Sequence, residues 1–332
     1  MEKSSEKEQT PFKFNKWALV PVLLGAVLRY GPHAFYGNTR VYDKEVPLAV
    51  IDDFLPESSI EKLQDLIKRE RRFATAVEAS METGVQSMGE AVPVKLDGSC
   101  PDDMFAPDGK TCAFGGRIDI FKHFAITGGF WGAKETVEKL FSSIFTFINY
   151  YPNLIEDPAI KELFAMPQYT EEINRICSAG YGYDQTREMV FHPLQVNIVM
   201  IPPGQDLPLH HDNQWYWHMN QRAAPDWLLH VMHESGLFED QMIPQAQGVA
   251  YLHGTKEQPY YEHGGRYIYY PNGPGAQPHA FKPKRGQAII MDGGRTIHGV
   301  ERTHPGKLVG KFIKGNFNRI EYQGNDTWYA LR

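Results

Sequence analysis

The chain has 332 residues, of which 42% are hydrophobic and 13% aromatic, enough for a substantial core in one large domain or two. The formal net charge of -6 provides no basic footprint for nucleic acid, so no nucleic-acid partner is expected. Three cysteines are too few for a disulfide scaffold.

The first 40 residues are expected to form a tail ahead of the main domain. Residues 1–16 are polar and mixed in charge, which is typical of disorder. Residues 17–28 form an apolar run that is shorter than the roughly 20 residues needed to span a bilayer. The length also suits a signal-peptide core, although glutamates precede it and no clear cleavage site follows. Packing, targeting and anchoring all stay open for this run, and so do membrane association and localisation, with the cytoplasm favoured.

Three amphipathic stretches predict helices that would support one sheet, within a helical part that covers about 41–185. In the first stretch Ile60, Leu63 and Leu66 have the spacing of one helical face, with charged residues on the other. The predicted helices cover residues 57–72, 134–151 and 157–179.

Residues 80–116 are rich in glycine, proline and aspartate and predict a long irregular insertion. Cys100 and Cys112 flank a turn-rich part of it, and they are either two reduced thiols or a bridge. Cys177, in a predicted helix, is expected to pack in the core.

From residue 189 onward, short apolar runs alternate with turn signals, which favours a β-sandwich or barrel. This barrel core is expected over about 186–325, within a single domain that covers 41–332. The predicted strands cover residues 194–201, 227–232, 248–253, 266–270, 287–291 and 308–317.

Two imidazoles and one carboxylate have the spacing of a metal site. His210 and Asp212 lie two residues apart where a strand runs into a loop, so their side chains share a face. His298 follows an apolar run and the glycine turn at 292–294. Two histidines and one carboxylate occupy one face of octahedral Fe(II) and leave three positions for oxygen chemistry. The same donors suit Zn(II) with an open position, so a zinc hydrolase stays open.

The residues around these positions resemble the Fe(II)/2-oxoglutarate-dependent dioxygenases, in particular the prolyl-4-hydroxylase branch. The resemblance lies in the lead-in at 47–56, in PLHHD at 208–212, in GQAIIMD at 286–292 and in HGV at 298–300. It implies a mainly β fold with flanking helices, a double-stranded β-helix (jelly-roll) barrel whose open mouth holds the metal. It also implies Fe(II) on the three donors, 2-oxoglutarate and O2 as cosubstrates, and ascorbate as reductant.

Members of this superfamily usually hold the remote carboxylate of 2-oxoglutarate with an arginine or lysine on the strand after the second histidine. Lys307, Lys311 and Lys314 compete for this role, and Lys311 is preferred because it lies mid-strand beside Gly310, where a cosubstrate can approach closely. The longer gap between histidine and lysine departs from the prolyl-hydroxylase pattern.

Two further residues are candidates for substrate binding. Trp215 begins a run of three aromatic residues that would form a substrate wall or pack the barrel end. Arg295 is a partner for a substrate carboxylate or part of a structural salt bridge. His211 is expected to point away from the metal, and His230 and His233 are expected to diverge along a strand as core histidines.

The resemblance implies a C–H oxidation that is coupled to decarboxylation of 2-oxoglutarate: hydroxylation, desaturation or oxidative cyclisation. The long aromatic insert at 215–253 favours a small, amino-acid-like specialised metabolite over a prolyl peptide. The chain also resembles algal kainoid synthases, which implies ring closure on a dicarboxylated amine. The alternatives are a prolyl or peptidyl hydroxylase and a non-catalytic jelly-roll binding module. The oligomeric state is not indicated.

Overall fold

The structure, a computed structural model, describes 47–70, 72–75, 90–92, 117–119, 147–150, 156–181, 191–193, 196–201, most of 205–304, 319–324 and 327–331. The predicted apolar run at 17–28, Cys100, Cys112, the strand at 308–317 and the three candidate lysines, Lys311 included, lie outside these residues. None of the described helices is long and apolar enough to cross a membrane.

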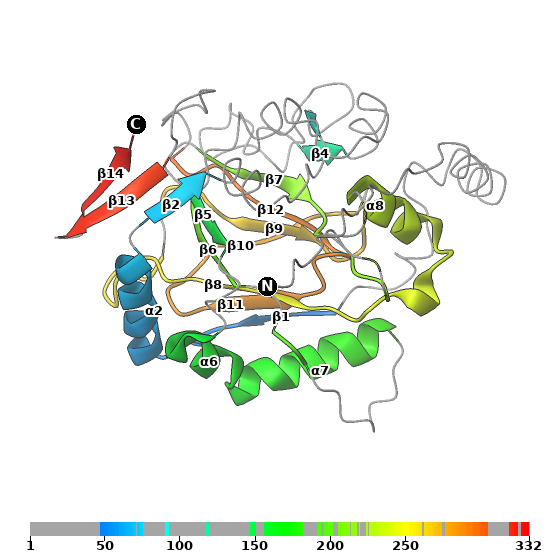
Figure 1. Ribbon diagram of the computed structural model, residues 1–332, viewed down its shortest axis with the longest axis horizontal. Helices are drawn as coiled ribbons and strands as arrows, with labels where there is room; N and C mark the ends of the chain where they lie inside the picture. Colours follow the sequence, from blue (N-terminus) through cyan, green and yellow to red (C-terminus); the bar gives the residue numbers. More distant parts are fainter. Residues whose placement is uncertain are drawn as a thin grey trace, which may run out of the picture.

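Two mostly antiparallel sheets face each other, as in a β-sandwich (Figure 1). One has the strand order β10-β9-β12-β7-β4-β3, in which only the β4–β7 pairing is parallel, and the other has the order β1-β11-β8. The six strands of the first sheet are β3 (Glu90–Val92), β4 (Arg117–Asp119), β7 (Leu207–His210), β9 (Tyr267–Tyr270), β10 (His279–Phe281) and β12 (Ile297–Val300). The second contains β1 (Leu48–Ile51), β8 (Gln247–Ala250) and β11 (Ala288–Met291).

A third, five-stranded antiparallel sheet has the order β14-β13-β2-β5-β6. Its strands are β2 (Arg72–Thr75), β5 (Phe147–Tyr150), β6 (Asn197–Met200), β13 (Arg319–Gly324) and β14 (Thr327–Leu331).

Strand β11 is central to the core because both of its faces are covered. Ile289 and Met291 pack against Tyr267 of the opposite sheet, whereas Ala288 and Ile290 pack against helices. All four residues are buried, which explains why this strand is an uninterrupted apolar run and not an alternating one.

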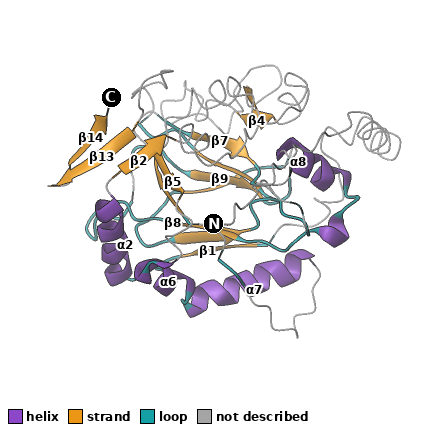
Figure 2. Cartoon of the chain, in the orientation of Figure 1, coloured by secondary structure: helices purple, strands orange, loops and turns teal. Residues whose placement is uncertain are grey.

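Helices α2 (Glu57–Glu70), α6 (Pro158–Phe164) and α7 (Pro167–Tyr181) lie along the side of the β1-β11-β8 sheet that faces away from the other sheet (Figure 2). Helix α2 buries Ile60, Leu63 and Leu66. Helix α6 begins where the Asp157 side chain accepts a hydrogen bond from the amide of Ala159, at 2.9 Å.

Helix α8 (Asp226–Ser235) and the short 3-10 helix η6 (Glu239–Gln241) lie in the connection from β7 to β8. Their surroundings form a small hydrophobic core of their own, which includes Tyr216, Leu229, Met232 and Met242. The position of α8 therefore depends on packing within this connection.

Strands overlap four of the predicted segments, at 194–201, 248–253, 266–270 and 287–291, and a strand ends at His210, as predicted. The prediction of a strand at 227–232 was wrong, because these residues belong to helix α8. Helix α8 is buried on most sides, so its sequence shows neither helical nor strand periodicity.

Three helix predictions need correction. The segment 157–179 contains two helices with a break at 165–166. The first helix ends at Glu70, and Arg72 begins strand β2. Residues 147–150 of the helix predicted at 134–151 form strand β5, and the rest of that segment lies outside the described residues.

Candidate metal centre

Strands β7 and β12 place the two predicted histidine ligands side by side. They pair antiparallel, with His210 directly opposite His298. Opposed residues on neighbouring strands project from the same face, and the two imidazole centroids lie 4.4 Å apart. Both side chains are buried. The pairing thus joins two parts of the chain that are remote in sequence.

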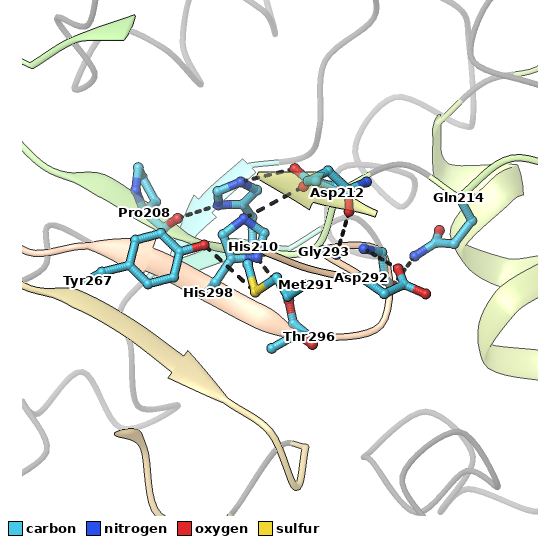
Figure 3. Close-up of polar contacts among 12 residues, drawn as sticks. Pro208, His210, Asp212, Gln214, Tyr267, Met291, Asp292, Gly293, Thr296 and His298 are labelled. Atoms are coloured by element: carbon cyan, nitrogen blue, oxygen red, sulfur yellow. Dashed lines mark hydrogen bonds and ion pairs between the residues drawn. The ribbon is translucent and has the colours of Figure 1, made fainter. Parts of the chain in front are cut away.

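Asp212 completes the group from the loop after β7. One carboxylate oxygen, Oδ1, lies 3.5 Å from His210 Nε2, and the other, Oδ2, lies 3.7 Å from His298 Nε2 (Figure 3). One ligand atom from each residue lies within 4.8 Å of the other two, and among the described residues no other set of histidine, cysteine and acidic side chains meets this criterion. Metal–ligand bonds of about 2.1 Å place neighbouring donors roughly 3 Å apart. The three residues therefore need only a slight contraction to coordinate one ion.

Hydrogen bonds from the other ring nitrogen fix both imidazoles. His210 Nδ1 donates to the carbonyl of Pro208 at 2.7 Å, and His298 Nδ1 donates to the carbonyl of Thr296 at 2.9 Å. A proton on Nδ1 leaves the lone pair of Nε2 directed at Asp212. Histidines that bind metals are usually held in this way. Each strand supplies its own carbonyl, two residues before the histidine.

The protonation states of the site also favour metal binding. Burial opposes ionisation of Asp212, but the neighbouring charge of His298 and the hydrogen bond and charge of His210 outweigh it, so its pKa lies below the usual range. Burial lowers the pKa of His298 to about 4. Near neutral pH the carboxylate is therefore ionised and the His298 imidazole neutral, the forms that coordinate a metal.

The turn before β12 lies directly against Asp212. The amide of Asp212 donates to the carbonyl of Gly293 at 2.9 Å. A Cβ atom on Gly293 would overlap Oδ2 of Asp212. Glycine is therefore required here because the metal-facing carboxylate occupies the space of a side chain.

Glutamine side chains hold the same turn. Gln247 Oε1 accepts a hydrogen bond from the amide of Gly293 at 2.6 Å, and Gln214 Nε2 donates to the carbonyl of Gly294. The carboxylate of Asp292 accepts from the amide of Gly294 at 3.0 Å. These bonds fix the turn from β8 and from the loop that carries Asp212. Sequence reasoning missed both glutamines, because they meet the turn only after folding.

Two tyrosines belong to the core between the sheets, and one of them, Tyr267, lies beside His298. The ring of Tyr267 stacks on His298, with centroids 5.9 Å apart and an interplanar angle of 15°. The Tyr251 hydroxyl is buried and has no hydrogen-bond partner within the described part of the chain. Burial raises the pKa of both phenols, so each keeps its proton. The Tyr251 hydroxyl therefore remains available to donate to a bound acceptor.

Trp215 and Arg295, the two predicted substrate contacts, are both partly buried. Trp215 is partly buried, and its carbonyl accepts a hydrogen bond from the amide of Ile243 at 2.8 Å. Tyr216, the next aromatic residue, packs in the core around α8, and Trp217 is 60% exposed. Arg295 is partly buried in the turn before β12, and its amide donates to the carbonyl of Asp292. The roles of Trp215 and Arg295 in substrate binding stay predictions from sequence.

Three more histidines gather on the side of helix α8. His230 and His233 lie three residues apart on this helix and therefore share a side, whereas the sequence prediction had them diverging along a strand. The His211 ring lies 6.3 Å from each of theirs, centroid to centroid. Two histidines three residues apart share a side only in a helix, so this spacing would have predicted their proximity if the segment had been interpreted as a helix.

A crystal structure of a Pseudomonas putida prolyl-4-hydroxylase is similar to this chain, with 14% sequence identity and a TM-score of 0.36 over 79% of this chain and 88% of that one. No family model matches the sequence, and no curated protein matches it either. At this TM-score the functional assignment depends on the geometry of the site.

Proposed function

We propose that the protein is an Fe(II)/2-oxoglutarate-dependent oxygenase that acts on a small, amino-acid-like molecule. The observation that carries the proposal is the meeting of His210, Asp212 and His298, with both imidazole Nε2 atoms directed at the carboxylate. Two nitrogens and one oxygen on one side of an ion leave its other positions open, as oxygenase chemistry with ferrous iron requires.

The strand connections support the jelly-roll barrel that the sequence predicts. Along the chain, β7 lies in one layer, β8 in the other, β9 and β10 in the first again, β11 in the second and β12 in the first. Four of these five steps cross between the two sheets, and repeated crossing of this kind supports a jelly roll. The metal residues lie at the end of β7, in β12 and in the adjoining loop.

The donor set and the surrounding groups fit the cosubstrate as well. Lys311 remains the proposed partner for the remote carboxylate of 2-oxoglutarate, and the buried hydroxyl of Tyr251 is a second donor. The stacked ring of Tyr267 covers one side of His298 and keeps water from it. Trp215 and Arg295 remain proposed substrate contacts.

Bound Fe(II), with 2-oxoglutarate and O2, would supply an oxidant for an unactivated C–H bond and release succinate and CO2. The described residues would hold the ion, keep His298 neutral and position the substrate next to it. Ascorbate is the expected reductant in the assay. Within this proposal the outcome is hydroxylation, desaturation or cyclisation, and the ring closure of the kainoid type stays a prediction from sequence.

The test is an assay of protein that is purified without oxygen and loaded with Fe(II). Incubation with 2-oxoglutarate, ascorbate and O2 should form succinate, first by slow uncoupled turnover and faster when a metabolite extract supplies the substrate. Mass spectrometry of the stimulated reaction should show a product changed by one oxygen atom or by loss of two hydrogens. A prolyl peptide that stimulates as well as any extract would favour a peptidyl hydroxylase instead.

Two results would contradict the proposal. Protein that retains zinc, gains no activity with iron and hydrolyses a substrate would be a zinc hydrolase. Protein that binds 2-oxoglutarate or another ligand but forms no succinate with any extract would be a binding module.

A further inference from the structure

Helix α8 presents a histidine face to the metal centre. Its residues Leu228, Leu229 and Met232 belong to the hydrophobic core of the β7–β8 connection. The Tyr216 hydroxyl donates to the carbonyl of Leu229 at 3.4 Å. With the helix fixed on that side, His230 and His233 lie together on another, and they are only 5% and 2% exposed.

This histidine face lies next to the proposed metal ligands. His211, which stands between His210 and Asp212 in the sequence, has its ring 6.3 Å from the rings of both α8 histidines. The charges of Asp212 and His210 also act on His230. The three imidazoles of His211, His230 and His233 thus form a group near Asp212, whose charge interacts with His211 and His230; we refer to them as the histidine wall.

His230 carries a buried polar atom that the fold itself does not satisfy. Its Nε2 makes no hydrogen bond to any of the residues that the structure describes. A buried group of this kind destabilises the folded protein unless a ligand or water satisfies it. His230 Nε2 is therefore a candidate contact for a bound ligand.

The histidine wall is not arranged as a second metal site. Within the described residues, only His210, Asp212 and His298 bring three donor atoms together. The wall instead suits an anion. Burial, followed by the charge of His233, lowers the pKa of His230 to about 3, whereas the charge of Asp212 raises it, so His230 is neutral near pH 7. A neutral imidazole N–H donates a hydrogen bond to a carboxylate, so the histidine wall can bind a negatively charged ligand.

We propose that His230, with His211 and His233, binds a carboxylate of the substrate and so positions its C–H bond beside the metal. The inference rests on the proposed oxygenase function and extends it to a substrate class, small carboxylic acids. His230 is then a residue that determines specificity.

The first experiment compares small carboxylic acids, each paired with its methyl ester, as stimulators of succinate formation by the Fe(II)-loaded protein. Acids should stimulate turnover and their esters should not. Equal stimulation by the two members of each pair, or stimulation by neutral molecules only, would overturn the proposal. Uncoupled, iron-dependent succinate formation without added acid tests the oxygenase function separately.

The second experiment replaces His230 by residues of similar size and good helix propensity. His230→Leu removes the nitrogen and should raise the KM for the best acid by about tenfold or more, with a smaller change in kcat. His230→Gln places an amide near the position of Nε2 and should restore most of the affinity. The exposed His192→Leu is the matched control and should leave KM unchanged. An unchanged KM in His230→Leu would contradict the proposal.

A third measurement needs no substrate. Because leucine removes an unsatisfied polar atom, the metal-free His230→Leu protein should melt at the same temperature as the unaltered protein or higher. A marked drop in melting temperature would show a structural role and overturn the inference.

Metal titration should give one Fe(II) per chain. A second equivalent that is lost in His230→Leu would assign the histidine wall to a metal instead.

Discussion

The junction of β7 and β12 and helix α8 both bury histidines, but the hydrogen bonds of these histidines differ. At the junction, His210 and His298 each donate from Nδ1 to a carbonyl of their own strand, which leaves Nε2 for the metal. On α8, the buried Nε2 of His230 has no hydrogen-bond partner in the described structure. The difference agrees with the two proposals, a metal ion held by the strands and an exchangeable ligand bound at the helix.

The largest expected effect comes from removal of the carboxylate at the junction. Asp212→Ala removes the oxygen donor that lies between the two imidazoles and should reduce iron-dependent succinate formation at least 100-fold, on the order expected for loss of a ligand. Iron content per chain and succinate yield, measured on the same sample, check this. Activity within a few-fold of that of the unaltered protein would remove Asp212 from the site.

Addition of one methyl group to the turn before β12, at Gly293, should have the next largest effect on the metal site. Gly293→Ala forces Asp212 away because the new Cβ overlaps Oδ2, and iron affinity should fall roughly 10- to 100-fold. Gly248→Ala is the matched control, since its Cβ would meet no heavy atom closer than 3.5 Å and its affinity should not change. Equilibrium titration with Fe(II) under anaerobic conditions compares the two. Equal affinities would show that the turn does not position the carboxylate.

Loss of one supporting hydrogen bond should have a smaller effect. Gln247→Leu removes the acceptor for the amide of Gly293 and should lower iron affinity roughly tenfold, the lower end for groups that support a ligand. Gln247→Glu keeps an acceptor oxygen at that position and should retain more affinity than the leucine variant. The same titration measures both, and the reverse order would contradict the role assigned to the glutamine.

The sequence predicted these two regions with different success, and for physical reasons. Strand β11 was recognisable because a buried strand shows as a short apolar run between turn signals, and the end of a strand at His210 was inferred from the spacing of His210 and Asp212. The histidine and aspartate ligands were recognisable because their chemistry is tied to a fixed spacing. Their meeting with His298 depended on strand pairing, which the structure supplies.

Helix α8 could not be predicted because it is buried on most sides and so lacks an amphipathic pattern. The run at 227–232 is also short enough to suit a strand. The glutamines around Gly293 and the orphaned nitrogen of His230 left no local signal, since each acts through a contact between distant segments. Lys311 lies outside the described residues, so its role stays a prediction.

A separate effect, which needs no metal or substrate, concerns the acid stability of the metal-free protein. His230 has a pKa of about 3 when folded, below its ordinary value of 6.5, so the unfolded chain takes up the proton first as pH falls. Stability from this group is complete above about pH 6.5 and is lost progressively as pH falls toward 3. Between pH 6.5 and pH 5 the loss is about 2 kcal/mol.

His230→Leu should therefore lose less stability than the unaltered protein between pH 7 and pH 5, because one titrating group is gone. Urea unfolding in the presence of a chelator, at both pH values, measures the difference. Identical losses in the two proteins would mean that the imidazole titrates normally and is not buried as described.

The central claim, that the three side chains bind one iron, is tested most directly by iron X-ray absorption of the Fe(II)-loaded protein. We expect scattering from two imidazoles, with the remaining positions filled by oxygen, and a change in those oxygen ligands when 2-oxoglutarate is added without O2. His298→Ala should leave only one imidazole. Iron bound without imidazole, or a spectrum that His298→Ala leaves unchanged, would contradict it.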